Sequence, residues 1–142
     1  MSLSTYPDVP LTMLNAVPTG ISDACQENRI KTALGLPMDR VIPKVNREML
    51  SRYYEYLSAN LLFPFVAHYP EPTNALEERE FRCVVSSLLP PEKLGDEFDG
   101  LFCKVRKETC KLNLPLIELV VPQKSSNFQL IEDYWYWLWN WR

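Results

Sequence analysis

Residues 53–65, YYEYLSANLLFPF, decide how this chain is organised. They continue an apolar pattern that begins at Met49 and recurs every three or four residues, which is the spacing of one face of an α-helix. Asn46 stands before the pattern as a suitable N-cap, and Pro64 disfavours the α conformation in the residue that precedes it. The stretch therefore predicts a helix that starts after Asn46 and ends before Pro64, where the chain leaves as a strand.

The region before this helix predicts a second helix and an arm. Between Ser22 and Leu34 the apolar residues fall near one face of a short helix, which Gly35 and Pro37 then end. Three prolines interrupt the residues that come earlier. We expect residues 1–20 to form an extended, Pro-containing arm and residues 21–142 to form a single α+β domain.

Beyond residue 72 the apolar residues alternate with polar ones, which is typical of strands with one buried face. Residues 80–89, EFRCVVSSLL, fit one strand, and residues 101–121 fit two strands around a turn near Lys107 to Thr109. Pro115 implies an edge position or a bulge. These lengths predict a small, strongly bent, SH3-like or barrel-like antiparallel sheet of four or five strands, with the amino-terminal helices packed on it.

The last segment, SSNFQLIEDYWYWLWNWR at residues 125–142, predicts an aromatic carboxyl-terminal helix. Ser126 and Gln129 have the spacing of a capping box. In a helix the four tryptophans form two stripes, whereas in a strand all four share one face. The stripes are either a lid on the core or an exposed docking surface for another protein.

The composition is that of a globular protein, with 46% hydrophobic and 23% charged residues. A net charge of −3 argues against the basic surface that nucleic acid requires. No apolar run approaches the roughly 20 residues of a membrane helix, and the start MSLSTYPDVP lacks the regions of a signal peptide. We therefore expect a cytoplasmic protein with neither nucleic acid nor a membrane as its partner.

Residues for catalysis are scarce. The only histidine is His68, and four glycines leave no room for a GxGxxG, P-loop or GxSxG motif. The four cysteines form no CxxC pair, although Cys103 and Cys110 leave open a contact across a hairpin. The sequence thus predicts no enzyme and no zinc or redox centre.

Carboxylates form three clusters, and calcium takes six to eight oxygen ligands from groups of this kind. The clusters are Glu77, Glu78 and Glu80; Asp96, Glu97 and Asp99; and Glu132 with Asp133. The middle cluster lies in a loop between Gly95 and Gly100. It is no EF-hand, because Phe98 takes the third ligand position and no glutamate stands at the twelfth.

Two stretches resemble a known family: YYEYLSANLLFPF at residues 53–65 and IEDYWYWLWNWR at residues 131–142. They are similar to the small bacterial calcium-binding proteins known first from cyanobacteria. The resemblance extends over residues 46–142, including the DEFDGLFCKV and LPLIELVV segments. It implies a cytosolic protein with helices on a small barrel-like sheet, which binds calcium without an EF-hand and has no known catalysis.

The sequence therefore predicts a non-enzymatic calcium-binding or calcium-buffering protein. The expected ligand is Ca²⁺, held by Asp96, Glu97 and Asp99, with Glu77, Glu78 or Glu80 as helpers. The alternative is a protein–protein interaction module without metal, which uses the Trp-rich segment to bind a protein partner.

Overall fold

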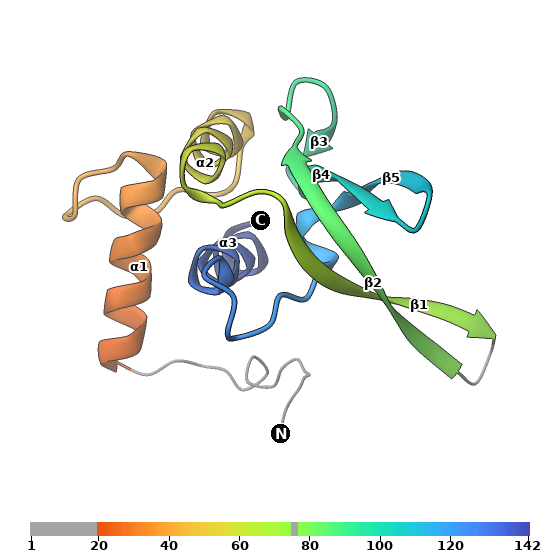
Figure 1. Cartoon of the computed structure of the whole chain (residues 1–142). Coiled ribbons are helices and arrows are strands. Elements are labelled where there is room, and N and C mark those ends of the chain that lie inside the picture. Colours follow the sequence, from red (N-terminus) through yellow and green to blue (C-terminus); the bar gives the residue numbers. More distant parts are fainter. Residues whose placement is uncertain (1–19, 75–76) are drawn as a thin grey trace.

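The computed structural model describes residues 20–74 and 77–142, and it describes only the backbone of residues 20–24, 71–74 and 77–79. Within these ranges three α-helices and a five-stranded antiparallel sheet form the α+β fold that the sequence predicts (Figure 1). The elements are α1 (Gly20–Leu34), α2 (Arg47–Asn60), β1 (Phe65–Asn74), β2 (Glu77–Leu88), β3 (Gly95–Asp96), β4 (Gly100–Lys107), β5 (Cys110–Pro115), the 3-10 turn η2 (Leu116–Glu118) and α3 (Phe128–Trp141). The predicted arm lies outside the described residues, except that Gly20 begins α1.

Helix α2 forms where residues 46–61 predict it. The Asn46 side chain accepts a hydrogen bond from the Met49 N–H at 2.8 Å, which satisfies one of the free donors of the first turn. The buried face includes Tyr53 and Leu57, and on the exposed side Glu48 pairs with Arg52 at 2.9 Å. The chain then enters β1 at Phe65, so both the helix and the strand after Pro64 are confirmed.

The sheet is built around β2 and β4. The strands run in the order β1-β2-β4, with β3 pairing the start of β4 and β5 pairing β4 alone. The turn between β4 and β5 falls at residues 108–109, as predicted, and Pro115 ends a strand at the sheet margin. Cys103 lies opposite Leu114, so the suggested contact between Cys103 and Cys110 is wrong.

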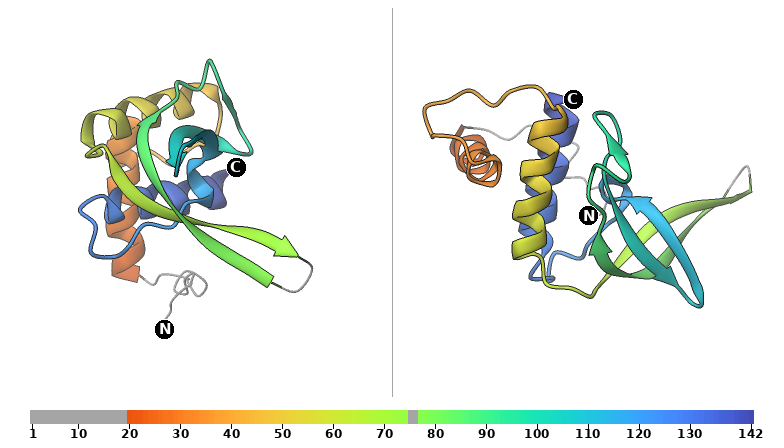
Figure 2. Two further views of the ribbon diagram at one scale, coloured as in Figure 1. Left: turned by 45° about the vertical axis from the view of Figure 1, so that its right-hand side comes forward. Right: turned by 90° about the horizontal axis from the view of Figure 1, so that it is seen from above.

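The helices form two layers on one side of the sheet. Helices α2 and α3 lie next to the sheet, and α1 packs against α2 and α3 from outside (Figures 1 and 2). Tyr53 of α2 lies against Tyr134 and Trp137 of α3, with ring centroids 5.3 and 4.8 Å apart. In the described ranges no helix is both long and apolar enough to cross a membrane.

The predicted capping box at the start of α3 is absent. The helix begins at Phe128 with Asn127 as its N-cap residue, and no side chain caps it. The Asn127 amide instead accepts a hydrogen bond from the Leu62 N–H and donates one to the Leu62 carbonyl, at 2.9 and 3.0 Å. This link joins the start of α3 to the end of α2, a contact that local spacing does not encode.

The helical form of α3 separates its four tryptophans. Trp137 is fully buried, Trp135 and Trp141 are half-buried, and Trp139 is 51% exposed. The rings of Trp135 and Trp139 lie against each other at a tilt, with centroids 5.8 Å apart, as the predicted stripe requires. The segment is therefore mainly part of the core, with one exposed indole.

Candidate functional site

The acidic loop, which we define as Asp96 to Asp99, connects β3 to β4. One oxygen of Asp96, Oδ1, accepts hydrogen bonds from the N–H groups of Phe98 and Asp99 at 2.8 and 2.6 Å. Such a bond from an aspartate to the backbone two residues later closes a tight turn. The loop is thus shaped by its own first residue, and the second oxygen of Asp96 makes no hydrogen bond in the described part.

Helix α3 and its C-cap residue contact this loop and the start of β4 at three points. The Tyr134 hydroxyl accepts a hydrogen bond from the Leu101 N–H at 2.8 Å, and Arg142 donates one to the Phe98 carbonyl at 2.6 Å. Between them, Gly100 has φ 76° and approaches Leu138 so closely that a Cβ there would overlap it. Tyr134, Leu138 and Arg142 are spaced by four residues, so one stripe of α3 and its C-cap positions the end of the loop and the start of β4.

The two ends of this stripe differ in environment. Burial raises the pKa of the Tyr134 hydroxyl above its ordinary value, so a neutral phenol meets Leu101. Arg142 lies near the surface, with its guanidinium 4.1 Å from the Phe98 ring centroid and 4.3 Å from that of Trp139. The loop thus already has a cation of the chain itself at one of its carbonyl oxygens.

The acidic loop offers oxygens that are free to bind a cation. Asp96 and Glu97 are exposed and Asp99 is half-buried, and none of the three forms an ion pair within residues 20–74 and 77–142. In these same ranges no group of three or more His, Cys, Asp or Glu side chains is gathered so that it could hold a metal ion. Any ion bound here must therefore take backbone carbonyls or water as further ligands.

The backbone of the first predicted cluster, Glu77, Glu78 and Glu80 in the β1–β2 hairpin, lies at the other end of the sheet from this loop. Asp96 pairs with Gly100 at the start of β4, whereas Val84 pairs with Arg106 near its end. Strand β4 has eight residues, so roughly 23 Å separates its two ends at about 3.3 Å per residue. Glu80 lies four residues before Val84 on β2, beyond the end of β4, and pairs with Pro70 of β1.

The structure therefore does not bring Glu80 to the loop of Asp96, Glu97 and Asp99. The backbone of Glu77 and Glu78 lies still nearer the hairpin tip, and their side chains are outside the description. One ion cannot bridge the two clusters.

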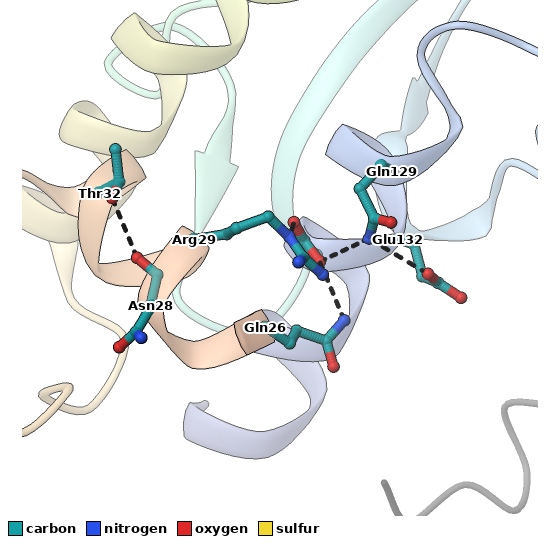
Figure 3. A network of polar contacts seen from close by, with 7 residues as sticks. Gln26, Asn28, Arg29, Thr32, Gln129 and Glu132 are labelled. Atoms are coloured by element: carbon teal, nitrogen blue, oxygen red, sulfur yellow. Dashed lines mark hydrogen bonds and ion pairs between the residues drawn. The ribbon is translucent and has the colours of Figure 1, made fainter. Parts of the chain in front are cut away.

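Asp133, in the third acidic cluster, is fully engaged within the protein. Its carboxylate accepts hydrogen bonds from Arg29 Nε and Nη2 at 2.7 and 3.1 Å, and from the side-chain amides of Gln26 and Gln129 at 3.0 Å each. Figure 3 shows these side chains converging from α1 and α3. Asp133 is only 4% exposed, so this carboxylate ties α1 to α3 and is not free to bind calcium.

Its neighbour Glu132 has a pKa raised above its ordinary value, first by burial and then by the charge of Asp133. No local pattern in the sequence predicted that Asp133 links α3 to Arg29 of α1, because these two residues are 104 positions apart.

Neither the histidine nor the cysteines form a metal site in the described part of the chain. The backbone of His68 pairs with Val120, which joins β1 to the segment after η2. Cys83 and Cys103 are buried, and burial raises the pKa of Cys103 to about 12, so this thiol stays protonated. The oxygens of the acidic loop remain the candidate ligands.

A comparison with protein families decides the classification. Residues 42–138 match the model of a family that is described as calcium binding, the CcbP type. The chain belongs to this calcium-binding family. The resemblance seen in residues 53–65 and 131–142 is thereby confirmed.

A solved structure of the CcbP family has the same fold. The crystal structure of CcbP from Anabaena matches with a TM-score of 0.62 and 21% identity, covering 87% of this chain and 94% of that one. Only four residues follow residue 138, so this wider match must include residues before 42, the region that contains α1. The structural match thus extends farther toward the amino terminus than the sequence resemblance, which started at residue 46. No curated protein matches the chain.

Proposed function

We propose that this member of the CcbP family binds Ca²⁺ at the acidic loop through Asp96, Glu97 and Asp99, and that it does so without catalysis. The observation that carries the proposal is that these carboxylates have no cationic partner among the described residues, while the buried Asp133 is saturated by Arg29 and two amides. Calcium favours such oxygens and tolerates irregular geometry. The free carboxylates and the loop carbonyls supply the ligands, and water completes the shell.

The contact of Arg142 with the loop supports modest affinity. Its guanidinium donates to the Phe98 carbonyl, and an ion that used this oxygen would have to displace it. A tethered cation competes with a free one and raises the calcium concentration at which the loop fills. This competition suits a protein that buffers or reports calcium over a range of concentrations better than one that holds calcium permanently.

The hairpin carboxylates Glu77, Glu78 and Glu80 have a separate role in this proposal. They lie too far from the acidic loop to share its ion, so any calcium that they bind is a second ion. Titration of the loop variants below leaves such a second site intact and separates the two.

The absence of catalysis is also part of the proposal. His68 is the only imidazole, and Cys103 in the core stays protonated. An activated nucleophile requires a base within hydrogen-bond reach, whereas the Thr32, Ser86 and Cys103 side chains all donate to backbone carbonyls. We therefore expect the protein to bind and release calcium without catalysing a reaction.

The test is a calorimetric titration of metal-free protein with calcium, and with magnesium as a control ion. We compare the wild type with Asp96→Asn/Asp99→Asn, in which the amide oxygen introduced at position 96 retains the acceptor that closes the turn. The expected result is at least a tenfold loss of calcium affinity. The control is Asp39→Asn, which removes a charge at an exposed position away from the loop.

Equal calcium binding by the loop variant and the wild type would place the family's ligand elsewhere on this chain. Because binding heat can vanish by compensation, a calcium-dependent shift in melting temperature serves as the second readout.

A further inference from the structure

The outer face of the sheet carries a basic patch, which we define as Arg82, Lys104, Arg106 and Lys111. All four are exposed. Arg106 lies directly opposite Lys111 on β5 and opposite Val84 on β2, and residues opposite each other share a face. Arg82 and Lys104 share this face because side chains alternate along a strand.

The cations of this patch have no ion-pair partner among the described side chains. Within the described ranges none of the four side chains forms an ion pair or a side-chain hydrogen bond. Among the described side chains of β1, β2, β4 and β5, Glu80 alone adds a carboxylate to this face. Like charges directly across a strand pair, as at Arg106 and Lys111, cost stability. An otherwise acidic protein with a net charge of −3 thus bears a local surface that is complementary to anions.

The same region has an open strand edge. Strand β5 pairs only with β4, and Figure 1 shows it at the margin of the sheet. Alternate residues of an antiparallel strand turn their N–H and C=O groups away from the partner. In the part of the chain that is described, no backbone hydrogen bond joins β5 to any other segment. The edge beside Lys111 therefore offers N–H and C=O groups without a strand partner, up to Pro115, which has no N–H to donate.

We propose that β5 is a docking edge for an acidic polypeptide segment, which adds to the sheet as a further strand with its carboxylates beside Lys111 and Arg106. The open edge selects a polypeptide, because only a peptide backbone can continue the ladder. The basic patch selects the acidic side chains of that segment. Nucleic acid fits less well, because among the described side chains of this face only Phe102 and His68 carry rings that could stack on bases.

The test uses a synthetic acetylated and amidated heptapeptide in which glutamate alternates with valine or threonine. Titration into ¹⁵N-labelled protein, followed by amide chemical shifts, is expected to move the signals of β5 and its neighbours on β4. Two N-methylated versions of the peptide are compared, and in each the methyl groups block one edge of the peptide strand. They should differ in affinity for the protein, because only the version whose unmethylated edge faces β5 can pair with it. Binding should also weaken as salt increases.

The charge contribution is tested with Arg106→Gln/Lys111→Gln. We expect about a tenfold loss of peptide affinity. The control Lys44→Gln/Lys124→Gln makes the same change in net charge at positions outside the sheet and should bind like the wild type.

Three results would overturn the proposal. The first is peptide shifts that spread away from β5, or that are the same for both methylated versions. The second is an oligothymidine that shifts the basic patch while the peptide does not, which would assign the face to nucleic acid. The third is a charge variant that aggregates yet binds the peptide normally, which would leave the cations with the role of keeping edges apart.

Discussion

Two acidic regions of this chain have similar composition and opposite environments. Asp133 is buried between α1 and α3, and four hydrogen bonds from three side chains surround its carboxylate. The acidic loop of Asp96 to Asp99 is near the surface, and its carboxylates bind only the loop's own backbone within the described residues. The difference lies in the partners, because a carboxylate that already neutralises an arginine has little left to offer an ion.

The two regions are also connected through one helix. Asp133 and Tyr134 are neighbours in α3, with Asp133 bonded to α1 and Tyr134 bonded to the start of β4. One side of the helix therefore fixes the fold's outer layer, and the other side fixes the candidate calcium loop. The following variants test whether these two roles can be separated.

The largest loss of stability is expected for Gly100→Ala, which disrupts the close contact between Gly100 and helix α3. The new Cβ would overlap Tyr134 and Leu138, and φ 76° disfavours any side chain, so we expect a loss of about 3 kcal/mol in the free energy of unfolding. Gly35→Ala is the matched control: its φ is similar at 71°, but an added Cβ would meet only the Arg52 guanidinium at an ordinary contact distance of 3.7 Å, so about 1 kcal/mol is expected. Urea denaturation measures both, and equal losses would show that the contact with α3 is unimportant.

The next effect is expected for Asp133→Asn. Arg29 and the two glutamines would lose a charged acceptor, at a cost of about 2 kcal/mol, since Arg29 is partly exposed and keeps some hydration. Calcium affinity should stay at the wild-type value, because this carboxylate is not proposed as a ligand. Urea unfolding and calorimetry on the same sample check both statements. A loss of calcium binding without a loss of stability would make Asp133 a calcium ligand and not a structural link.

Arg142→Gln tests whether Arg142 competes with calcium at the acidic loop. Removing the guanidinium frees the Phe98 carbonyl and takes away a competing positive charge, so calcium affinity should rise about threefold. Arg40→Gln makes the same charge change at an exposed residue before α2 and should leave the affinity nearly unchanged. Weaker calcium binding in Arg142→Gln would mean that this arginine organises the loop rather than competing with the ion.

The smallest effect is expected for Glu132→Gln. The pKa of Glu132 is raised in the folded protein above the ordinary 4.5, so the folded state binds this proton more tightly than the unfolded state. Stability from this group is present at low pH and is lost as the pH rises through the raised pKa. The glutamine variant avoids that loss and should be more stable near pH 7 by about 0.5 kcal/mol, a small figure because the group keeps some solvent. The gain in stability should disappear near pH 4. Urea unfolding at both pH values measures it, and a variant less stable than the wild type at pH 7 would contradict the prediction.

Local features of the fold were predictable from the sequence. The cap at Asn46, the helical spacing up to Leu57 and the turn at residues 108–109 depend on neighbouring residues, and all appear where expected. The helix α3 was predicted with Ser126 as its cap, but its N-cap residue is Asn127, whose side chain bonds to Leu62, 65 positions away. Sequence spacing carries no information on such partners.

The candidate site shows the same division. Grouping Asp96, Glu97 and Asp99 in one turn follows from their adjacency, and it remains a prediction that they bind the ion. That Glu80 lies at the far end of the sheet, and that Asp133 is bound by Arg29, follow from strand register and helix packing. Tertiary contacts therefore decided which acidic groups are free, while the sequence could only say where acidic groups are numerous.

The stacking of Arg142 on Trp139 gives this protein an intrinsic optical signal. Trp137 is sealed in the core, whereas Trp139 is half in solvent and lies 4.3 Å from the guanidinium that also contacts the acidic loop. A calcium ion that displaced Arg142 would change the charge above this exposed indole and leave the buried one untouched. Calcium occupancy of the loop should thus be readable from the red edge of the tryptophan emission, without any added dye.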